Sequence, residues 1–218
     1  CFIAFYSTPA FLSGNSLFAY AMLFYILTGT FDSVINANYG ALFPELFRDE
    51  ITGASLVANP GCYPTGASLA LAPLLKEGLI EPKGIVVSSV TGVSGGGKNP
   101  SPLFHFPYMN ENIYPYGVGV HRHMPEMEQV ASAVAGKPVE LLFQPHVGPF
   151  DRGIVSSTYS DPVKEIPPKQ LVELYGDFYK KEPFVQIVSK PPAVKNVAKT
   201  NYCHIFPTVA KGKVIVFS

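Results

Sequence analysis

The densest group of residues able to do chemistry lies at Asn59–Gly66, where the sequence reads NPGCYPTG. A short β-like run ends there in a Pro-Gly turn, and a helix is predicted over Thr65–Gly78. Cys62 is therefore expected at or near a helix N-terminus, where unpaired backbone N–H groups and the helix dipole stabilise a thiolate. The same N–H groups suit a developing oxyanion. The alternative is a small buried cysteine that only packs.

Two histidines flank an arginine at His121, Arg122 and His123, just ahead of a predicted helix that begins at Pro125. A neutral imidazole there is suited to take the proton of Cys62 and later to protonate a leaving group. Arg122 is suited to a bidentate contact with a carboxylate or a phosphate. Two alternatives stay open: exposed surface histidines, or a zinc site, for which the sequence spacing supplies no third ligand.

A third candidate is the glycine-rich run at Ser94–Lys98, which reads SGGGK. Glycines let a backbone approach a phosphate or a flat ring closely. The spacing is not that of a P-loop, and a flexible turn is the alternative. Further along, Arg152 is either a second anion contact or an ion-pair partner of Asp151, on a turn that is also expected to hold His146.

The elements that must position these residues follow an α+β pattern. A helix is predicted over Pro125–Gly136 from its terminal signals, and a strongly periodic amphipathic helix over Lys169–Glu182. Strands are predicted over Gly84–Val90, Val139–His146, Gly153–Ser160, Phe184–Ser189, Asn201–Phe206 and Lys213–Ser218. This order predicts a mixed, mainly antiparallel sheet with helices on one face.

Composition narrows the class of protein. The 218 residues carry 16 Lys+Arg against 16 Asp+Glu, so no basic excess favours a nucleic-acid partner. Charged residues make up only 15%, which is consistent with a buried oligomer interface or a missing solvated part. The three cysteines form no CxxC pair, which argues against a disulfide framework and for a reducing compartment.

The first segment differs from the rest. Cys1–Phe31 contains no charged residue, and Leu17–Leu27 is continuously apolar. A membrane span needs about 20 apolar residues, which is longer than this run, and a signal peptide needs a positive start that is absent. We favour a wrongly joined or mistranslated end of an incomplete chain, with a membrane segment as the alternative.

Together these stretches resemble N-acetyl-gamma-glutamyl-phosphate reductase. The residues that carry the resemblance are ELFRDEI, LVANPGCYPTGASLALAPLL, TGVSGGGK, NEN, YGVGVHRHMPEMEQ and FQPHVGPFDRGIVSSTY. It runs from about Tyr39 to Ser218, and the GCYPT and HRHxPE pair is quite specific. Reductases of an amino-group-carrier lysine pathway share most of these motifs. Aspartate-semialdehyde and glyceraldehyde-phosphate dehydrogenases are more distantly similar, which implies the fold of their C-terminal domain.

The resemblance implies a cytoplasmic homo-oligomer, a dimer or tetramer, that uses NADPH and no metal to reduce an acyl phosphate in arginine biosynthesis. A thioester on Cys62 would be the intermediate, and His123 is favoured over His121 as acid/base because it lies nearer the helix start. The implied site residues are catalytic Cys62, His121 and His123, substrate-binding Asn59 and Arg122, and cofactor-facing Ser94, Gly95 and Gly96.

The chain departs from the family at both ends. Residues 1–38 match nothing in it, residues 39–61 look like a remnant of a Rossmann dinucleotide-binding domain, and residues 62–218 look like a catalytic and dimerisation domain cut at its C-terminus. The GxxGxxG-type loop of the family is absent, so impaired NADP binding is expected. Two alternatives stay open: a non-catalytic remnant that associates with partners, and a cysteine hydrolase that uses Cys62 with water.

Overall fold

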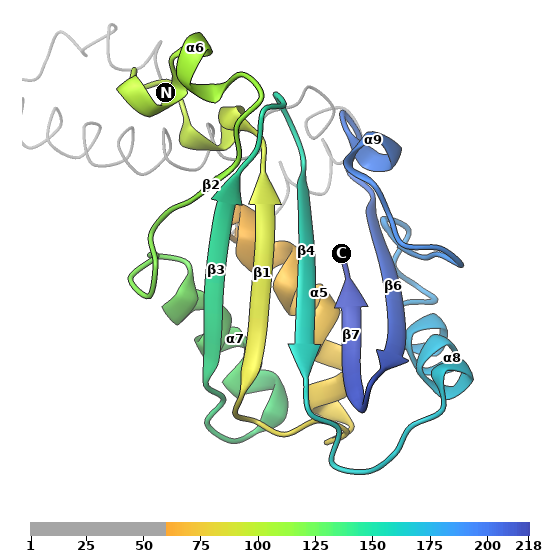
Figure 1. Ribbon diagram of the computed structural model, residues 1–218. Coiled ribbons are helices and arrows are strands. Elements are labelled where there is room, and N and C mark those ends of the chain that lie inside the picture. The colour runs from red at the N-terminus through yellow and green to blue at the C-terminus, as the bar shows by residue number, and fades with distance from the viewer. Residues whose placement is uncertain (1–59) are drawn as a thin grey trace, which may run out of the picture. The chain divides into compact units, whose positions relative to one another are not determined.

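The computed structural model describes residues 60–218, which form a seven-stranded mixed sheet in the order β2-β3-β1-β4-β7-β6-β5 (Figure 1). The β1–β3 and β5–β6 pairs are parallel and the other four pairs are antiparallel. The prediction of a mixed, mainly antiparallel sheet is therefore confirmed. The strands are β1 Ile85–Thr91, β2 Tyr114–Pro115, β3 Leu141–Val147, β4 Ile154–Ser160, β5 Val185–Ile187, β6 Cys203–Ala210 and β7 Lys213–Phe217.

Three longer helices cover one face of this sheet. Figure 1 shows α5 and α7 behind the central strands and α8 beside β6, which agrees with the packing of α5 on β4, α7 on β3 and α8 on β6. The helices are α5 Cys62–Lys76, α7 Met124–Ala135 and α8 Pro168–Phe178, with the short α6 Phe106–Met109 and α9 Val194–Val197 and the 3₁₀ turns η1 Val93–Gly96 and η2 Pro102–Phe104.

Helix α5 runs without a break through an internal proline, and a tyrosine hydroxyl supplies the hydrogen-bond donor that the proline lacks. Pro73 has no N–H, so the carbonyl of Leu69 loses its partner one turn ahead. The Tyr179 hydroxyl donates to that carbonyl over 2.7 Å. The helix ends at Lys76, and Gly78 adopts a left-handed φ of 61° that lets the Leu79 N–H bond back to Leu74.

The core lies between the helices and the sheet. Ala67, Ala70, Leu71 and Leu74 are buried at helical spacing along α5 and pack in the same cluster as Phe143 of β3. On α8, Leu171 and Tyr175 are buried as its periodicity predicts, but Phe178 is 37% exposed, and the next residue, Tyr179, is buried in its place.

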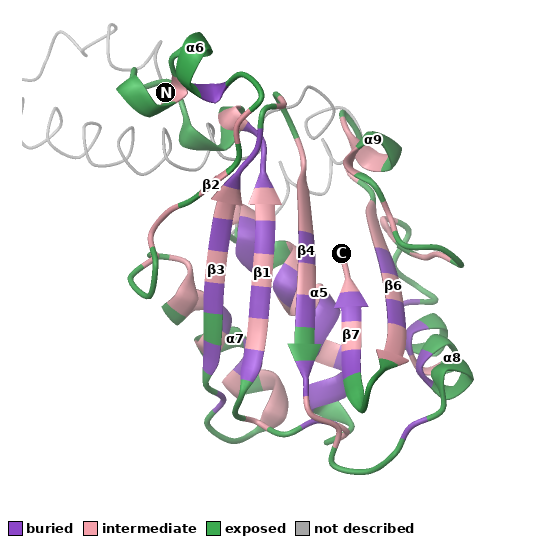
Figure 2. Cartoon of the chain, viewed as in Figure 1, coloured by how far each residue is buried: buried purple, intermediate pink, exposed green. Residues whose placement is uncertain are grey.

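The opposite face of the sheet is free of helices within residues 60–218 (Figure 2). Val86 of β1 pairs with Leu142 on one side and with Tyr159 on the other, and Tyr159 pairs with Ile215. Leu142 and Tyr159 are exposed. We call this surface the open face; it is an apolar row that crosses four strands.

Some boundaries and elements differ from the sequence-based expectations. Helix α5 begins at Cys62, three residues earlier than the predicted start at Thr65. The short elements η1, η2, α6, β2 and α9 were not predicted, because turns of four residues or fewer leave no periodicity to detect. His146 was expected on a turn and lies inside β3.

The predictions for residues 1–38, for most of 39–61 and for Asn59 fall outside the described residues. None of the helices within residues 60–218 has the length and apolarity needed to cross a lipid bilayer.

Candidate active site

Cys62 is the first residue of α5, which confirms its predicted place at a helix N-terminus. Gly61 caps the helix with extended backbone, and its carbonyl accepts the N–H of Thr65 over 3.0 Å and the Thr65 hydroxyl over 2.9 Å. The backbone N–H groups of Cys62 and Tyr63 reach the sulfur and lower the pKa of the thiol. The cysteine is half-buried rather than sealed in the core.

The charge state of Cys62 differs from the expected resting thiolate. Burial is the largest influence and raises the pKa of the Cys62 thiol, although the two backbone N–H groups and Arg122 lower it. The side chain of Glu126 raises it further. The sulfur therefore rests as a thiol at neutral pH, and a base must remove its proton before it can act as a nucleophile.

His123 is the imidazole that lies against the turn before Cys62. A Cβ placed on Gly61 would lie 2.9 Å from the Nε2 atom of His123. Burial and the positive charge of Arg122 lower the pKa of His123, so the ring is neutral near pH 7. Its Nδ1 atom is buried with no hydrogen-bond partner within residues 60–218, so Nε2 is the atom available for proton transfer.

His121 has a different environment, inside a group of aromatic rings. The rings of Tyr63, Tyr116 and Phe143 surround it edge-on, with centroids 5.1–5.7 Å away. Its Nδ1 atom accepts the backbone N–H of His123 over 3.2 Å. Burial, with the charge of Arg122 and the neighbouring His123, lowers the pKa of His121 to about 4. His121 is thus a neutral hydrogen-bond acceptor that holds the backbone of His123.

Two residues of the site were not singled out from the sequence as working side chains. The hydroxyls of Tyr63 and Tyr116 are hydrogen-bonded over 2.9 Å, and burial raises the pKa of both phenols. Both stand beside motif residues, Tyr63 directly after Cys62 and Tyr116 five residues before His121. That adjacency was the only signal available, because tyrosine alone indicates packing as readily as chemistry.

Arg122 is exposed, yet its charge acts on the whole cluster. It lowers the pKa of Cys62, His121 and His123. The structure thus brings four of the predicted site residues together at the starts of α5 and α7.

The residues of the glycine-rich run pack against neighbouring parts of their own chain. The Ser94 hydroxyl donates to the backbone carbonyl of Asp151 over 2.6 Å. A Cβ on Gly95 would meet the Thr91 hydroxyl at 3.1 Å, and one on Gly96 would meet the Phe104 ring at 2.3 Å. The first three residues of the run belong to the 3₁₀ turn η1, and Gly97 follows it as the C-cap.

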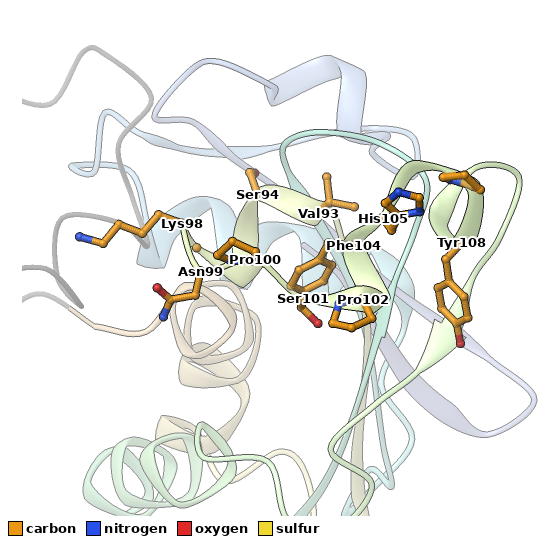
Figure 3. Close-up of a pocket in the computed structure, with 12 residues that line it drawn as sticks. Val93, Ser94, Lys98, Asn99, Pro100, Ser101, Pro102, Phe104, His105 and Tyr108 are labelled. Carbon is orange, nitrogen blue, oxygen red and sulfur yellow. The ribbon is translucent and has the colours of Figure 1, made fainter.

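An open hollow of about 1120 Å³ lies beside this run, lined by Ser94, Lys98, Phe104, His105 and Tyr108 among others (Figure 3). Its polar side chains do not converge on one point, and the Ser94 hydroxyl is already engaged. This hollow therefore does not by itself form a dinucleotide site, and we derive no chemical step through one. Arg152 lies 3.5 Å from the carboxylate of Asp151, as the ion-pair interpretation predicted.

The zinc alternative finds no support in the described part of the chain. His121 and His123 lie with their ring centroids 5.0 Å apart, but no group of three His, Cys, Asp or Glu side chains within residues 60–218 is placed to hold a metal ion.

The fold and the family model agree on the class. Residues 62–218 match the family described as semialdehyde dehydrogenase, dimerisation domain, and the chain belongs to this family. Aspartate semialdehyde dehydrogenase II from Vibrio cholerae has the same fold, with a TM-score of 0.59 at 14% identity over 84% of this chain and 63% of that one. The enzyme from Francisella tularensis gives a TM-score of 0.56 at 12% identity, over 72% and 58%.

Comparison with curated relatives defines the family more narrowly. N-acetyl-gamma-glutamyl-phosphate reductase of Pelobacter propionicus is 47% identical over 84% of this chain and 54% of its own length. The protein of that name from Desulforudis audaxviator is 46% identical over 84% and 53%. The resemblance stated from the motifs is confirmed, and the chain spans about half the length of the curated relatives that it matches.

Proposed function

We propose that this chain carries the acyl-transfer machinery of an N-acetyl-gamma-glutamyl-phosphate reductase, with Cys62 as nucleophile and His123 as its acid/base. The observation that carries the proposal is the junction of two helix starts. Cys62 opens α5, and the Nε2 atom of His123, the N-cap of α7, approaches within 2.9 Å of a Cβ position on the preceding Gly61. The names of the 46–47% identical relatives supply the reaction.

The first step transfers the acyl group to sulfur. Neutral His123 takes the proton of the Cys62 thiol, so the S–H bond breaks and an N–H bond forms at Nε2. The thiolate then attacks the carbonyl carbon of the acyl phosphate. The C–O bond to phosphate breaks, inorganic phosphate leaves with the bonding pair, and a thioester remains on Cys62. The N–H groups at the start of α5 face the oxygen that becomes negative during this attack.

Reduction of that thioester needs a hydride donor, and we propose NADPH, as the family resemblance implies. A bound hydride donor would supply the hydride, and the semialdehyde would be the product. His123, protonated in the first step, is placed to return its proton to the sulfur of Cys62 and so restore the thiol. The substrate is proposed to be an N-acetyl-glutamyl phosphate, with the lysine-pathway acyl phosphate as the alternative. Arg122, exposed beside the sulfur, is the proposed contact for its carboxylate or phosphate.

We assign the acid/base role to His123 because His121 already accepts a hydrogen bond and is a weak base. The Nδ1 atom of His121 accepts a backbone hydrogen bond, and its pKa of about 4 makes the ring a weak base. His123 keeps Nε2 directed toward Gly61 and Glu126.

We also propose that a second copy of the chain covers the open face. The matching family model is a dimerisation domain, and the face carries the exposed Leu142 and Tyr159 and the stacked rings of Phe206 and Phe217, 6.3 Å apart. A reducing, cytoplasmic location suits Cys62 and Cys203, which are both free thiols.

A phosphate-release measurement tests the acyl-transfer proposal. The chain is mixed with excess acyl phosphate and no reductant, and inorganic phosphate is followed in time. We expect a single burst of up to one equivalent per chain, absent in Cys62→Ser and much slower in His123→Asn. An equal burst in Cys62→Ser would contradict the proposal. Continued release without a reductant would favour the hydrolase alternative instead.

A further inference from the structure

Glu126 joins the starts of the two helices that carry the site. It lies in the first turn of α7, and its Oε1 atom accepts the backbone N–H of Gly61, the N-cap residue of α5, over 2.8 Å. The two residues are 65 positions apart in sequence, and α5 packs along α7. A single carboxylate oxygen therefore fixes the turn before Cys62 to the helix that begins beside His123.

The second oxygen of the same carboxylate and the imidazole of His123 both lie close to Gly61. A Cβ added to Gly61 would lie 2.9 Å from Oε2 of Glu126 and 2.9 Å from Nε2 of His123. Gly61 has φ −61° and ψ 153°, which any residue adopts, so glycine is required there by crowding rather than by backbone conformation. The carboxylate of Glu126 and the imidazole of His123 thus both lie close to the Cα atom of Gly61, in the turn before the nucleophile.

Two charged side chains near Gly61 shift the pKa values of Cys62 and His123 in opposite directions. The carboxylate of Glu126 raises the pKa of both Cys62 and His123, whereas the guanidinium of Arg122 lowers both. A carboxylate next to an imidazole favours its protonated form, which is the form that donates to a leaving group. Glu126 therefore acts in the direction that His123 needs after it has accepted the proton of Cys62.

We propose that Glu126 is a positioning residue, which ties the Gly61–Cys62 turn to helix α7 and places its negative charge close enough to His123 to favour the protonated imidazole. This inference rests on the proposed function, because it concerns the same nucleophile and acid/base. The plainer role is that of a structural link alone, in which the hydrogen bond to Gly61 matters and the charge does not.

The chain offers a set of variants that separates these roles. Glu126→Gln keeps an oxygen acceptor for the Gly61 N–H and removes the charge, while Glu126→Ala removes both. Glu128→Gln is the matched control, because Glu128 stands two residues further along α7 and its Oε1 also accepts a backbone N–H, that of Leu141, over 3.1 Å. The control loses the same charge from the same helix at a position that does not contact Gly61.

Two readouts are taken on the full chain: the phosphate burst with an acyl phosphate, and the rate of Cys62 alkylation by iodoacetamide against pH. The labelled peptide is identified by mass spectrometry, because the chain has three cysteines. In Glu126→Gln we expect the His123-dependent part of the pH profile to move by about half a unit to one unit toward lower pH. In Glu126→Ala we expect, in addition, a burst roughly ten- to a hundredfold slower, because the nucleophile is misplaced.

Glu128→Gln is expected to follow the unmodified chain in both readouts. Equal pH profiles in Glu126→Gln and the unmodified chain would overturn the role of the charge and leave a structural link. An unchanged burst in Glu126→Ala would overturn the positioning role altogether. If His123→Asn already leaves the profile of the unmodified chain unaltered, the proposed function fails with it, and that outcome is recognised from the histidine variant alone.

Discussion

The backbone N–H of His123 donates to the Nδ1 atom of His121 over 3.2 Å, so the two neighbouring imidazoles have different tasks. The ring of His121 is held by aromatic neighbours and acts on the backbone of His123, whereas the ring of His123 turns toward Gly61. In the His121-Arg122-His123 motif, His123 is thus the proposed acid/base, and His121 supports it by accepting its backbone N–H.

Substitution of the two histidines should separate these tasks. His121→Asn keeps a side-chain oxygen that is able to accept the His123 N–H, so we expect it to retain most of the acyl-transfer rate. His121→Ala should be roughly tenfold slower, because the backbone of His123 loses its partner. His123→Asn should lose about a hundredfold or more. Rapid-mixing phosphate bursts measure all three, and a larger loss in His121→Asn than in His123→Asn would reverse the assignment.

The low pKa of His121 predicts a stability that depends on pH. The folded-state pKa of about 4 lies below the ordinary value of 6.5, so between these values the unfolded chain binds more protons than the folded one. Stability should therefore be full above about pH 6.5 and fall progressively toward pH 4. Urea unfolding at a series of pH values should show a shallower fall in His121→Asn, and no change in slope for the exposed control His105→Asn. Parallel slopes in all three chains would contradict the assignment.

Tyr179 and Pro73 should be coupled in stability. Tyr179→Phe leaves the Leu69 carbonyl without a donor, which we expect to cost about 1–3 kcal/mol in the free energy of unfolding. Pro73→Ala returns a backbone N–H to helix α5 at the position that bonds Leu69. The cost of Tyr179→Phe should then shrink in the Pro73→Ala background, as a double-mutant cycle by urea denaturation would show. Additive effects would argue against the replacement role of the hydroxyl. Tyr202→Phe, at an exposed position outside the open face, is the control.

Charged residues introduced on the open face should weaken the proposed contact between two copies of the chain. Leu142→Lys with Tyr159→Lys places two cations in the apolar row, and we expect the oligomer to dissociate toward monomer. Val172→Lys on α8 is the matched control, because Val172 is a similarly exposed apolar residue on the helical side of the sheet. Sedimentation velocity distinguishes the species. An unchanged oligomer in the double variant would place the contact between copies elsewhere.

The sequence predicted those parts of the fold that have a regular spacing of apolar residues or are bounded by glycine and proline. Such signals are present in six of the seven strands of the sheet, all but β2, in the helix after Cys62 and in the helix that starts beside His123, and each of these was found within a few residues. The position of Cys62 at a helix start followed from the Pro-Gly turn. Its raised pKa did not follow, because burial depends on how α5 lies against the rest of the chain.

Contacts between distant residues were the part that sequence reasoning missed. The bond from Gly61 to Glu126 and the hydroxyl pair of Tyr63 and Tyr116 join residues 65 and 53 positions apart. The glycine run Ser94–Lys98 was interpreted as a ligand loop or a flexible turn, and that interpretation stays a prediction. The crowding of Gly95 by Thr91 and of Gly96 by Phe104 is a tertiary feature that no local pattern reveals. Local chemistry was therefore predictable, whereas the tertiary support around it was not.

The most direct test of the account is to locate the acyl group after the acylation step alone. The full chain is mixed with an acyl phosphate without reductant, quenched in acid, digested, and mapped by tandem mass spectrometry. We predict one acyl adduct, on the peptide that contains Cys62, sensitive to hydroxylamine as a thioester is, and formed much more slowly in His123→Asn. An adduct on Cys203 or on no cysteine, with Cys62 recovered as a free thiol, would contradict the central claim.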